Sequence, residues 1–355
     1  QLRRSIPAAP LRVGAPTTAG RGRMRNLAAC VVCALAHVSS GQAAEPPQAA
    51  GARLEARDEW SWAQRLARKR ECVEHGEGGV YLYHTRKAAG TTLRDLIKRA
   101  LATHAKSRYR VPLWETEGTA IDARALALRS VVTVVSLRRP VDRILSMYWY
   151  EHVGWWDGVR HEPSQLRPLR DWVNEWRDGS VWKADFARKN PGSVYVEIEN
   201  YYVKMLTGWN RNGQGEKVDR AALERAKDAL RRFDVVFVSE RSGHANHTEL
   251  LSRALGADVG GPMAHTLRAD DGAKKRLAQT LAPDVAAVRE TLEAFNSLDN
   301  ELYAFANKLI DARIRHHESE PLRRDKAGAR ERCEAIPTAQ LQKRNGIFRP
   351  PGHKH

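Results

Sequence analysis

A chain of 355 residues, 42% hydrophobic and 28% charged, is long enough to bury one sizeable core. Its formal net charge of +17 would suit a nucleic-acid binder, but residues 1–44 hold six basic and no acidic residues, and residues 313–355 hold eleven basic and five acidic ones. The central residues keep a net charge of +5. They lack the stripe of basic residues interleaved with aromatic residues that is typical of nucleic-acid binders, so we expect an anionic ligand and no nucleic-acid partner.

The segment 24–44 has the layout of a secretory signal. It begins Met-Arg-Asn, continues as a mostly apolar run over 27–38, and ends in small residues. The run is shorter than the ~20 apolar residues that cross a bilayer, so a cleaved signal is favoured, while a short membrane anchor stays open. Residues 1–23, rich in Arg, Gly, Pro and Ala, are interpreted as a non-native or disordered segment upstream of a start at Met24, and no function is expected there.

Two of the four cysteines, Cys30 and Cys33, lie inside the apolar run and would leave with a cleaved signal. A mature lumenal chain would keep Cys72 and Cys333. Two thiols in an oxidising compartment can pair, but the sequence does not give their separation. A disulfide and two free thiols are therefore both open.

Apolar periodicity predicts a mixed α/β domain. Buried strands are expected over 79–84, 131–137 and 234–239. Helices are expected over 91–102, 141–150, 219–232, 247–255, 271–281, 284–296 and 299–315. Uninterrupted apolar strands are usually covered on both faces, so we predict three layers, a parallel sheet flanked by helices, and a helical C-terminal half. A linker is expected over 45–59, the domain over 60–317, and a basic disordered tail over 318–355.

The turn after the first strand has the features of a phosphate site. It reads from His84 through Lys87 and Gly90 to Thr92 and leads into a helix. Unpaired N–H groups at a helix start attract anions, Gly90 permits a close approach, and Lys87 adds a full charge. The lysine precedes the glycine and the Walker A spacing is absent, which argues against a generic nucleotide kinase.

A second turn follows the strand over 131–137 and reads Arg138-Arg139-Pro140. Proline is favoured just inside a helix start, so Arg138 is expected at the carboxyl end of the strand, where α/β sheets bind ligands. Arg138 can fork two hydrogen bonds to a phosphate, and Ser146, two helical turns further on, can supply a third.

In combination, the two turns resemble the Golgi carbohydrate sulfotransferases, especially the heparan sulfate 2-O- and 6-O-sulfotransferase group. His-x-x-Lys-x-x-Gly-Thr-Thr is similar to the 5'-phosphosulfate loop of that family, and Arg-x-Pro with a serine eight residues after the arginine is similar to its 3'-phosphate site. Further similarities follow at 200–208, 233–240 and 296–303, so the resemblance covers roughly residues 79 to 310.

This resemblance implies a P-loop-like sulfotransferase fold and transfer of a sulfuryl group from 3'-phosphoadenosine 5'-phosphosulfate (PAPS) to a carbohydrate hydroxyl. The product would be 3'-phosphoadenosine 5'-phosphate (PAP), no metal would be needed, and the protein would work in the Golgi lumen or be secreted. The implied donor-binding residues are Arg86, Lys87, Ala88, Ala89, Gly90, Thr91, Thr92, Arg138 and Ser146.

Two positions depart from the family pattern. Ala88-Ala89 stands where the family loop has Thr-Gly, and we expect the change to be tolerated because alanine is small. Arg139 replaces an acidic residue, which adds positive charge and removes a partner that the acidic side chain would have had.

Sulfuryl transfer needs a cation, for which Lys87 is the candidate, and a base for the hydroxyl proton. Relatives use a His or Glu between the two motifs. Glu115 is favoured, because 111–118 reads as a short strand with an exposed end. Glu117, His104 and His84 are the alternatives, although His84 is more simply explained as a structural residue that orients the loop.

The acceptor is less well determined. His152, Trp155 and Trp156 either line a sugar-stacking cleft or pack the end of a helix. A catalytically inactive glycan-binding protein on the same scaffold and a P-loop-related phosphotransferase stay as other functions. The intact Lys87 loop argues against the first, and the missing Walker spacing argues against the second. No zinc-type spacing surrounds the histidines of the tail.

Overall fold

A computed structural model of the chain describes residues 47–103, 111–117, 121, 123–155, 166–177, 198–208, 218–260, 277–319 and 333. The segments expected to be upstream sequence and a signal, over 1–23 and 24–44, lie outside these residues. Within the described part of the chain, no helix is both long enough and apolar enough to cross a membrane.

The centre of the fold is a sheet of four parallel strands in the order β2-β1-β3-β4. The strands are β1 (Gly79–His84), β2 (Leu113–Glu117), β3 (Val131–Leu137) and β4 (Val235–Val238). The predicted parallel α/β architecture is confirmed, and β1 and β3 have the predicted bounds. The chain leaves β1 to form β2 on one side and returns to form β3 on the other. The sheet therefore changes winding direction between β1 and β3, the place where open α/β sheets bind ligands.

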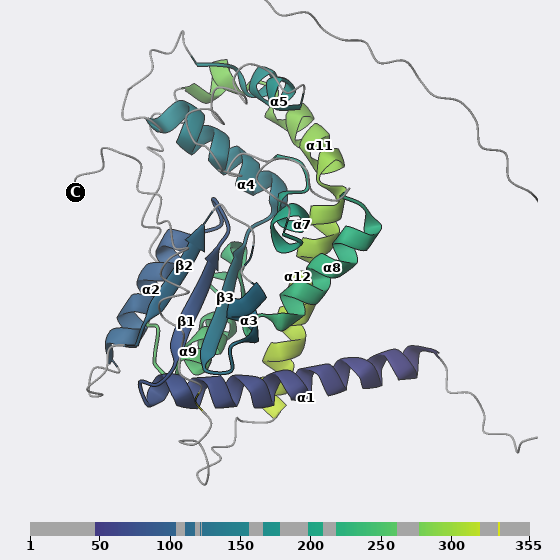
Figure 1. Ribbon diagram of the computed structural model, residues 1–355. Helices are drawn as coiled ribbons and strands as arrows, with labels where there is room; N and C mark the ends of the chain where they lie inside the picture. The colour runs from purple at the N-terminus through teal and green to yellow at the C-terminus, as the bar shows by residue number, and fades with distance from the viewer. Residues whose placement is uncertain are drawn as a thin grey trace, which may run out of the picture. The chain divides into compact units, whose positions relative to one another are not determined.

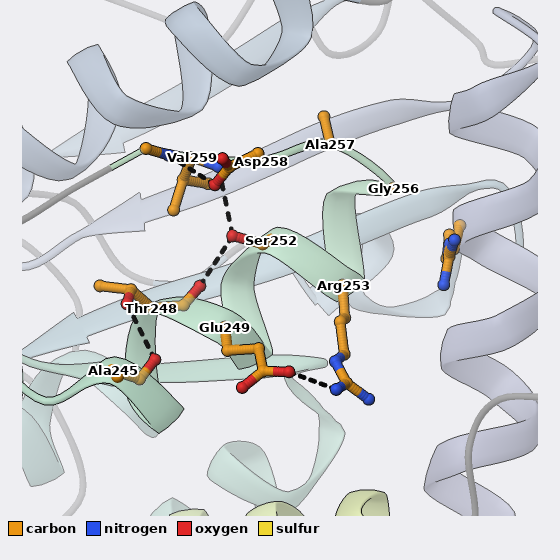
Figure 2. Close-up of a pocket in the computed structure, with 11 residues that line it drawn as sticks. Ala245, Thr248, Glu249, Ser252, Arg253, Gly256, Ala257, Asp258 and Val259 are labelled. Carbon is orange, nitrogen blue, oxygen red and sulfur yellow. Dashed lines mark hydrogen bonds and ion pairs between the residues drawn. The ribbon is translucent and has the colours of Figure 1, made fainter.

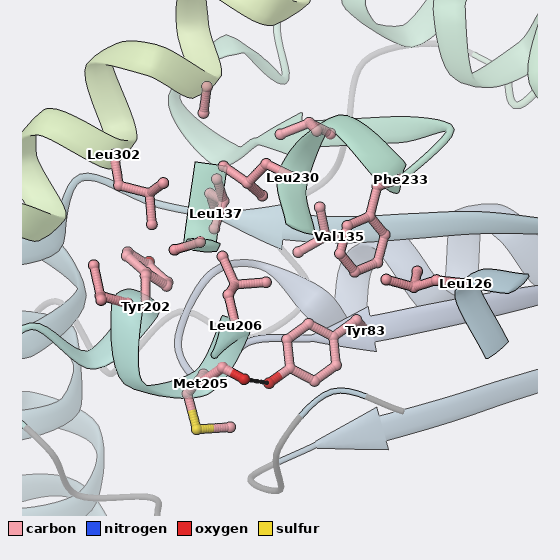
Figure 3. Packing of buried hydrophobic residues seen from close by; sticks show 14 of the residues in the cluster. Tyr83, Leu126, Val135, Leu137, Tyr202, Met205, Leu206, Leu230, Phe233 and Leu302 are labelled. Carbon is pink, nitrogen blue, oxygen red and sulfur yellow. Dashed lines mark hydrogen bonds between the residues drawn. The ribbon is translucent and has the colours of Figure 1, made fainter. Parts of the chain in front are cut away.

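Alternate residues of each strand enter two different cores. Tyr81 and Tyr83 of β1 lie in one hydrophobic cluster, whereas Val80 and Leu82 lie in the other. The first cluster, part of which Figure 3 shows, is covered by α3 (Ala123–Ala127), α7 (Tyr201–Leu206), α8 (Arg220–Arg232) and α12 (Ser297–Ser319). The second is covered by α1 (Pro47–Glu74), α2 (Gly90–Thr103) and α9 (Ala245–Leu255). Burial on both faces explains why the strands are apolar without interruption.

A third apolar cluster lies beyond the carboxyl ends of the strands, where Figure 1 shows α4, α5 and α11. Its elements are α4 (Pro140–Met147), the π-helix η1 (Tyr148–Trp155), α5 (Leu169–Arg177) and α11 (Val285–Phe295). The helix predicted over 141–150 is thus α-helical only to Met147 and continues as a π-helix. Of the helix predicted over 271–281, the structure describes 277–281, which is helical.

The linker expected over 45–59 does not match the structure, because α1 begins at Pro47 and the domain begins with it. Proline is tolerated in the first turn of a helix, and the Ala, Arg, Glu and Leu residues after Gly51 are strong helix formers. The Pro, Ala and Gly content of this segment therefore led to a wrong prediction of a linker. At the other end, α12 continues to Ser319, and apart from that helix end and Cys333 the expected tail lies outside the described residues.

Helix α1 is anchored to the sheet by a buried ion pair. Lys69 Nζ lies 2.7 Å from Asp234 Oδ2, and both side chains are buried. The same carboxylate oxygen accepts hydrogen bonds from the backbone N–H and the hydroxyl of Thr133, each at 2.8 Å. Several hydrogen bonds offset the cost of burying the two charges, so α1 is held in one position against β3 and the start of β4.

Cys72 of α1 and Cys333 form a disulfide, with their Cα atoms 5.8 Å apart. Of the two states left open by the sequence, the structure has the bonded one. The bond closes a loop across a sequence separation of 261 residues, which links the C-terminal segment to the helix that lies against the sheet.

Cys333→Ser is expected to lower the free energy of unfolding by roughly 2–4 kcal/mol, because the bond restricts the unfolded chain. Denaturant unfolding of the oxidised protein measures the loss, and reduction of the wild type should reproduce it. Cys72→Ser removes the same bond and should lower the free energy of unfolding by a similar amount. If neither Cys333→Ser nor a reductant changed the unfolding transition, the pairing would be contradicted.

Candidate active site

The two phosphate-type turns lie next to each other. Since β1 and β3 are adjacent and parallel, the segments that follow His84 and Leu137 emerge at the same edge of the sheet (Figure 1). Arg138 Nη1 donates a hydrogen bond to the backbone oxygen of Lys87 at 3.4 Å. The backbone N–H of Thr85 donates to Ser136 Oγ at 3.3 Å. The sequence places these turns more than fifty residues apart, and the sheet brings them into contact.

The β1–α2 turn has a tight, partly left-handed backbone. Lys87 and Ala89 both have φ near +61°. Such a conformation costs ~1–2 kcal/mol for a residue with a Cβ. Gly90 begins α2 directly over the ring of His84, and a Cβ built on Gly90 would overlap that ring. The turn thus brings the start of α2, with its outward N–H groups, close to Lys87.

Ala89 is held in a backbone conformation that the small size of alanine does not explain. Size alone makes alanine acceptable, and Ala88 is indeed fully buried. Ala89, however, stands where the family has glycine and takes a backbone conformation that favours glycine. The loop keeps the shape at an energetic cost that only the backbone geometry reveals.

Two adjacent tyrosines of α7 hold the two turns. The hydroxyl of Tyr201 accepts the backbone N–H of Arg86 at 3.1 Å. The hydroxyl of Tyr202 accepts the N–H of Arg138 at 3.0 Å and donates to the backbone oxygen of Arg138 at 2.9 Å. Burial raises the pKa of both phenols, so they stay neutral and keep their donor hydrogens. Each turn therefore rests on one side chain of the same helix.

Helix α7 is itself fixed by residues that follow it by almost a hundred positions. Asn200, before the helix, has a left-handed backbone and accepts the N–H of Asp299 at 3.2 Å. The Asp299 carboxylate accepts the N–H groups of Tyr202 and Val203 at 2.9 Å each. Burial raises the pKa of Asp299 to about 6, against the opposing effect of these hydrogen bonds and of Arg143. The sequence similarities at 200–208 and 296–303 thus coincide with a structural clamp.

Glu240, just after β4, holds the second turn from the other side. Its Oε1 accepts the backbone N–H of Arg139 at 2.9 Å and lies 4.0 Å from Arg138 Nε. Its Oε2 accepts the hydroxyl of Tyr303 at 3.1 Å. The Arg139 guanidinium, which stands where the family has an acidic side chain, is half-exposed and lies 3.5 Å from Asp142.

Ser146 lies on α4, six residues after Pro140 and therefore about 9 Å further along the helix axis. It is partly buried. Among the described contacts, no hydrogen bond joins Ser146 to Arg138. The structure thus places Ser146 on the helix that leaves the second turn, without bringing the two side chains into contact.

The Lys87 ammonium lies 3.2 Å from the centroid of the Tyr150 ring, a cation–π contact. Tyr150 belongs to η1, so the lysine side chain points from the first turn toward the helices beyond the sheet. Tyr150 was not a predicted site residue, and its neighbours His152, Trp155 and Trp156 were expected either to line an acceptor cleft or to pack the end of the helix.

The candidate bases on β2 are already engaged with basic groups. Glu115 Oε1 lies 2.7 Å from His84 Nδ1, and Glu115 Oε2 lies 3.5 Å from Arg94 Nη1. Glu117 Oε1 accepts a hydrogen bond from Arg86 Nη1 at 3.0 Å. Burial by itself would raise the pKa of the Glu117 carboxyl, but the charges of His84 and Arg86 have a larger effect in the opposite direction. The pKa of Glu117 is therefore lowered. The Arg86 guanidinium, expected to contact the donor, is thus turned to a carboxylate of β2.

The expected acceptor residues are only partly described. His152 Nε2 accepts the backbone N–H of Arg167 at 2.9 Å, and its ring lies 5.4 Å from that of Tyr148. This histidine therefore helps pack the segment before α5.

His104, Trp156 and the side chain of Trp155 lie outside the described residues. Thr91 and Thr92 are partly buried in the first turn of α2.

The sequence reasoning found the turns but missed their supports. Tyr201, Tyr202 and Glu240 lie in segments that had been noted for similarity, without any role. The sequence signal that could have indicated the two tyrosines is that they are adjacent aromatic residues directly after Asn200.

No protein-family model matches the chain, and no significant match is found among curated proteins.

Proposed function

We propose that the protein is a PAPS-dependent sulfotransferase that places a sulfuryl group on a hydroxyl of a carbohydrate. The observation that carries this proposal is the direct contact between Arg138 and the backbone of Lys87, at the point where the sheet changes winding direction. A single nucleotide with phosphates at both ends needs two anion-binding turns within its own length. The supports from Tyr201 and Tyr202 favour a site that is already formed before the nucleotide binds.

The reaction assigns a role to each turn. The start of α2 and Lys87 bind the 5'-phosphosulfate, and Arg138 binds the 3'-phosphate. The acceptor hydroxyl oxygen forms a bond to sulfur while the bond from sulfur to the bridging phosphate oxygen breaks. The electron pair of the broken bond stays on the 5'-phosphate of PAP, where Lys87 stabilises the developing charge. The hydroxyl proton passes to a base, and the reaction calls for no metal.

For the base we propose Glu115, with His84 as the positioning residue that holds its carboxylate at 2.7 Å. Glu117 is less suited because Arg86 binds it and lowers its proton affinity. Glu115→Gln should lower turnover roughly 10²-fold or more, with PAP affinity retained. Glu117→Gln is the matched control. Wild-type turnover in Glu115→Gln, or a larger loss in Glu117→Gln, would assign the base elsewhere.

The deciding experiment measures donor binding and transfer separately. Isothermal calorimetry with PAP tests the nucleotide site, and transfer of ³⁵S from labelled PAPS to a panel of glycans tests the reaction. We expect PAP binding and labelled glycan. PAP binding without any labelled product would favour the inactive glycan-binding alternative, and neither binding nor product would refute the proposal as a whole.

A further inference from the structure

The segment Asn246-His247-Thr248 is an acceptor sequence for N-linked glycosylation, Asn-x-Thr with a residue other than proline in the middle. It occurs once in the 355 residues. It opens helix α9, directly after the segment that carries Glu240.

The fold turns the asparagine of this segment to the surface. His247 is fully buried, its Nε2 accepts the backbone N–H of Val238 at 2.9 Å, and its ring lies 4.6 Å from that of Phe237. Burial lowers the pKa of His247 to about 3, so the ring stays neutral and keeps accepting this bond. Neighbouring residues of an α-helix point about 100° apart, and Asn246 is exposed. A bulky group on Asn246 therefore has room without disturbing the core.

The threonine of the segment lies on a different face of α9. Thr248 donates its hydroxyl to the backbone oxygen of Ala245 at 2.9 Å, and both residues line a surface depression of about 500 Å³. Figure 2 draws the lining residues and this hydrogen bond. Of the charged residues that line the depression, Arg253 binds Glu249, Arg70 binds Glu74, and Asp258 accepts the backbone N–H of Gly260, so they give no reason to assign it a ligand. Residues two apart on a helix do not face each other, so Asn246 and Thr248 can meet in an acceptor conformation only before α9 forms.

A separate feature points to the compartment in which this modification occurs. The Cys72–Cys333 disulfide forms in an oxidising environment, and the compartment that oxidises cysteines in eukaryotic secretion is also the one that adds N-linked glycans. From the acceptor segment, the exposure of Asn246 and the disulfide together, we propose that Asn246 carries an N-linked glycan. Nucleotide binding plays no part in this proposal, which stands or falls independently of the sulfotransferase reaction.

The test uses the full chain behind a strong cleavable signal sequence in cultured animal cells. On treatment with peptide N-glycosidase F, the wild-type protein should migrate faster on a gel, by the mass of one glycan. The peptide containing Asn246 should show the matching mass change. Asn246→Gln and Thr248→Ala should lack the shift. Thr248→Ser, which preserves the acceptor sequence, should retain it.

Disulfide formation, measured by thiol labelling, shows that each secreted variant has entered the oxidising compartment and folded. Secreted, disulfide-bonded wild type with an unmodified Asn246 would overturn the proposal. A glycosidase-sensitive shift that persists in Asn246→Gln would overturn it too.

Discussion

Lys87→Ala is expected to lower turnover by roughly 10²–10³-fold while PAP still binds, because in the proposed reaction the lysine acts on charge that develops on the leaving phosphate oxygen. Alanine at position 87 faces the same left-handed backbone restriction as lysine. The substitution therefore removes the ammonium group and its contact with Tyr150 without a new demand on the turn. Steady-state ³⁵S transfer, with PAP affinity measured in parallel by calorimetry, separates the two effects.

Lys98→Ala is the matched control for this variant. Lys98 is an exposed lysine of α2, the helix that follows the turn, so its removal changes the net charge equally without touching the turn. It should leave turnover unchanged. Equal kinetics for Lys87→Ala and wild type, or equal losses for Lys87→Ala and Lys98→Ala, would remove Lys87 from the mechanism.

Arg138→Ala should weaken nucleotide binding by roughly 10–100-fold, the effect of losing hydrogen bonds to a charged phosphate. The loss should appear with PAP and be much smaller with adenosine 5'-phosphosulfate, which has no 3'-phosphate. Tyr202→Phe removes only the hydroxyl that holds the backbone of Arg138, so it should give the same selectivity for the 3'-phosphate with a smaller effect, about 10-fold.

Arg139→Ala serves as the control for Arg138→Ala, since its guanidinium is half-exposed and directed to Asp142. It should change the affinity for either nucleotide little. Equal weakening of both nucleotides by Arg138→Ala would mean that the arginine supports the turn through Lys87 and does not recognise the 3'-phosphate.

The candidate site could be located from the sequence because its essential pieces are local. An apolar strand, a turn with Gly90 and a helix start occupy one short segment, and so do β3, Arg138 and Pro140. Each segment determines its own backbone by burial and by the steric rules of glycine and proline. For that reason β1 and β3 were predicted with their observed bounds, and the start of α2 was predicted to within one residue.

What holds the site together depends on partners far away in the chain. Tyr202 reaches Arg138 across 64 residues, Tyr201 reaches Arg86 across 115, and Asp299 fixes α7 across 97. The hydroxyl of a tyrosine has no preferred partner until packing has placed the ring, so no spacing rule predicts these bonds. The preference for Glu115 over Glu117 and His84 could not be settled from the sequence for the same reason, since the distances among these three residues depend on the register of β1 against β2.

The sequence by itself determined the strands, the two turns that follow β1 and β3, and the charges that these turns carry. The tertiary structure alone decided that the turns touch, that Cys72 bonds to Cys333, and that Ala89 takes a glycine-like conformation. Strands and turns follow from interactions between near neighbours, which a sequence contains directly. Contacts between distant residues exist only after the hydrophobic cores have fixed the sheet order, and the order β2-β1-β3-β4 is the step that brings Lys87 and Arg138 together.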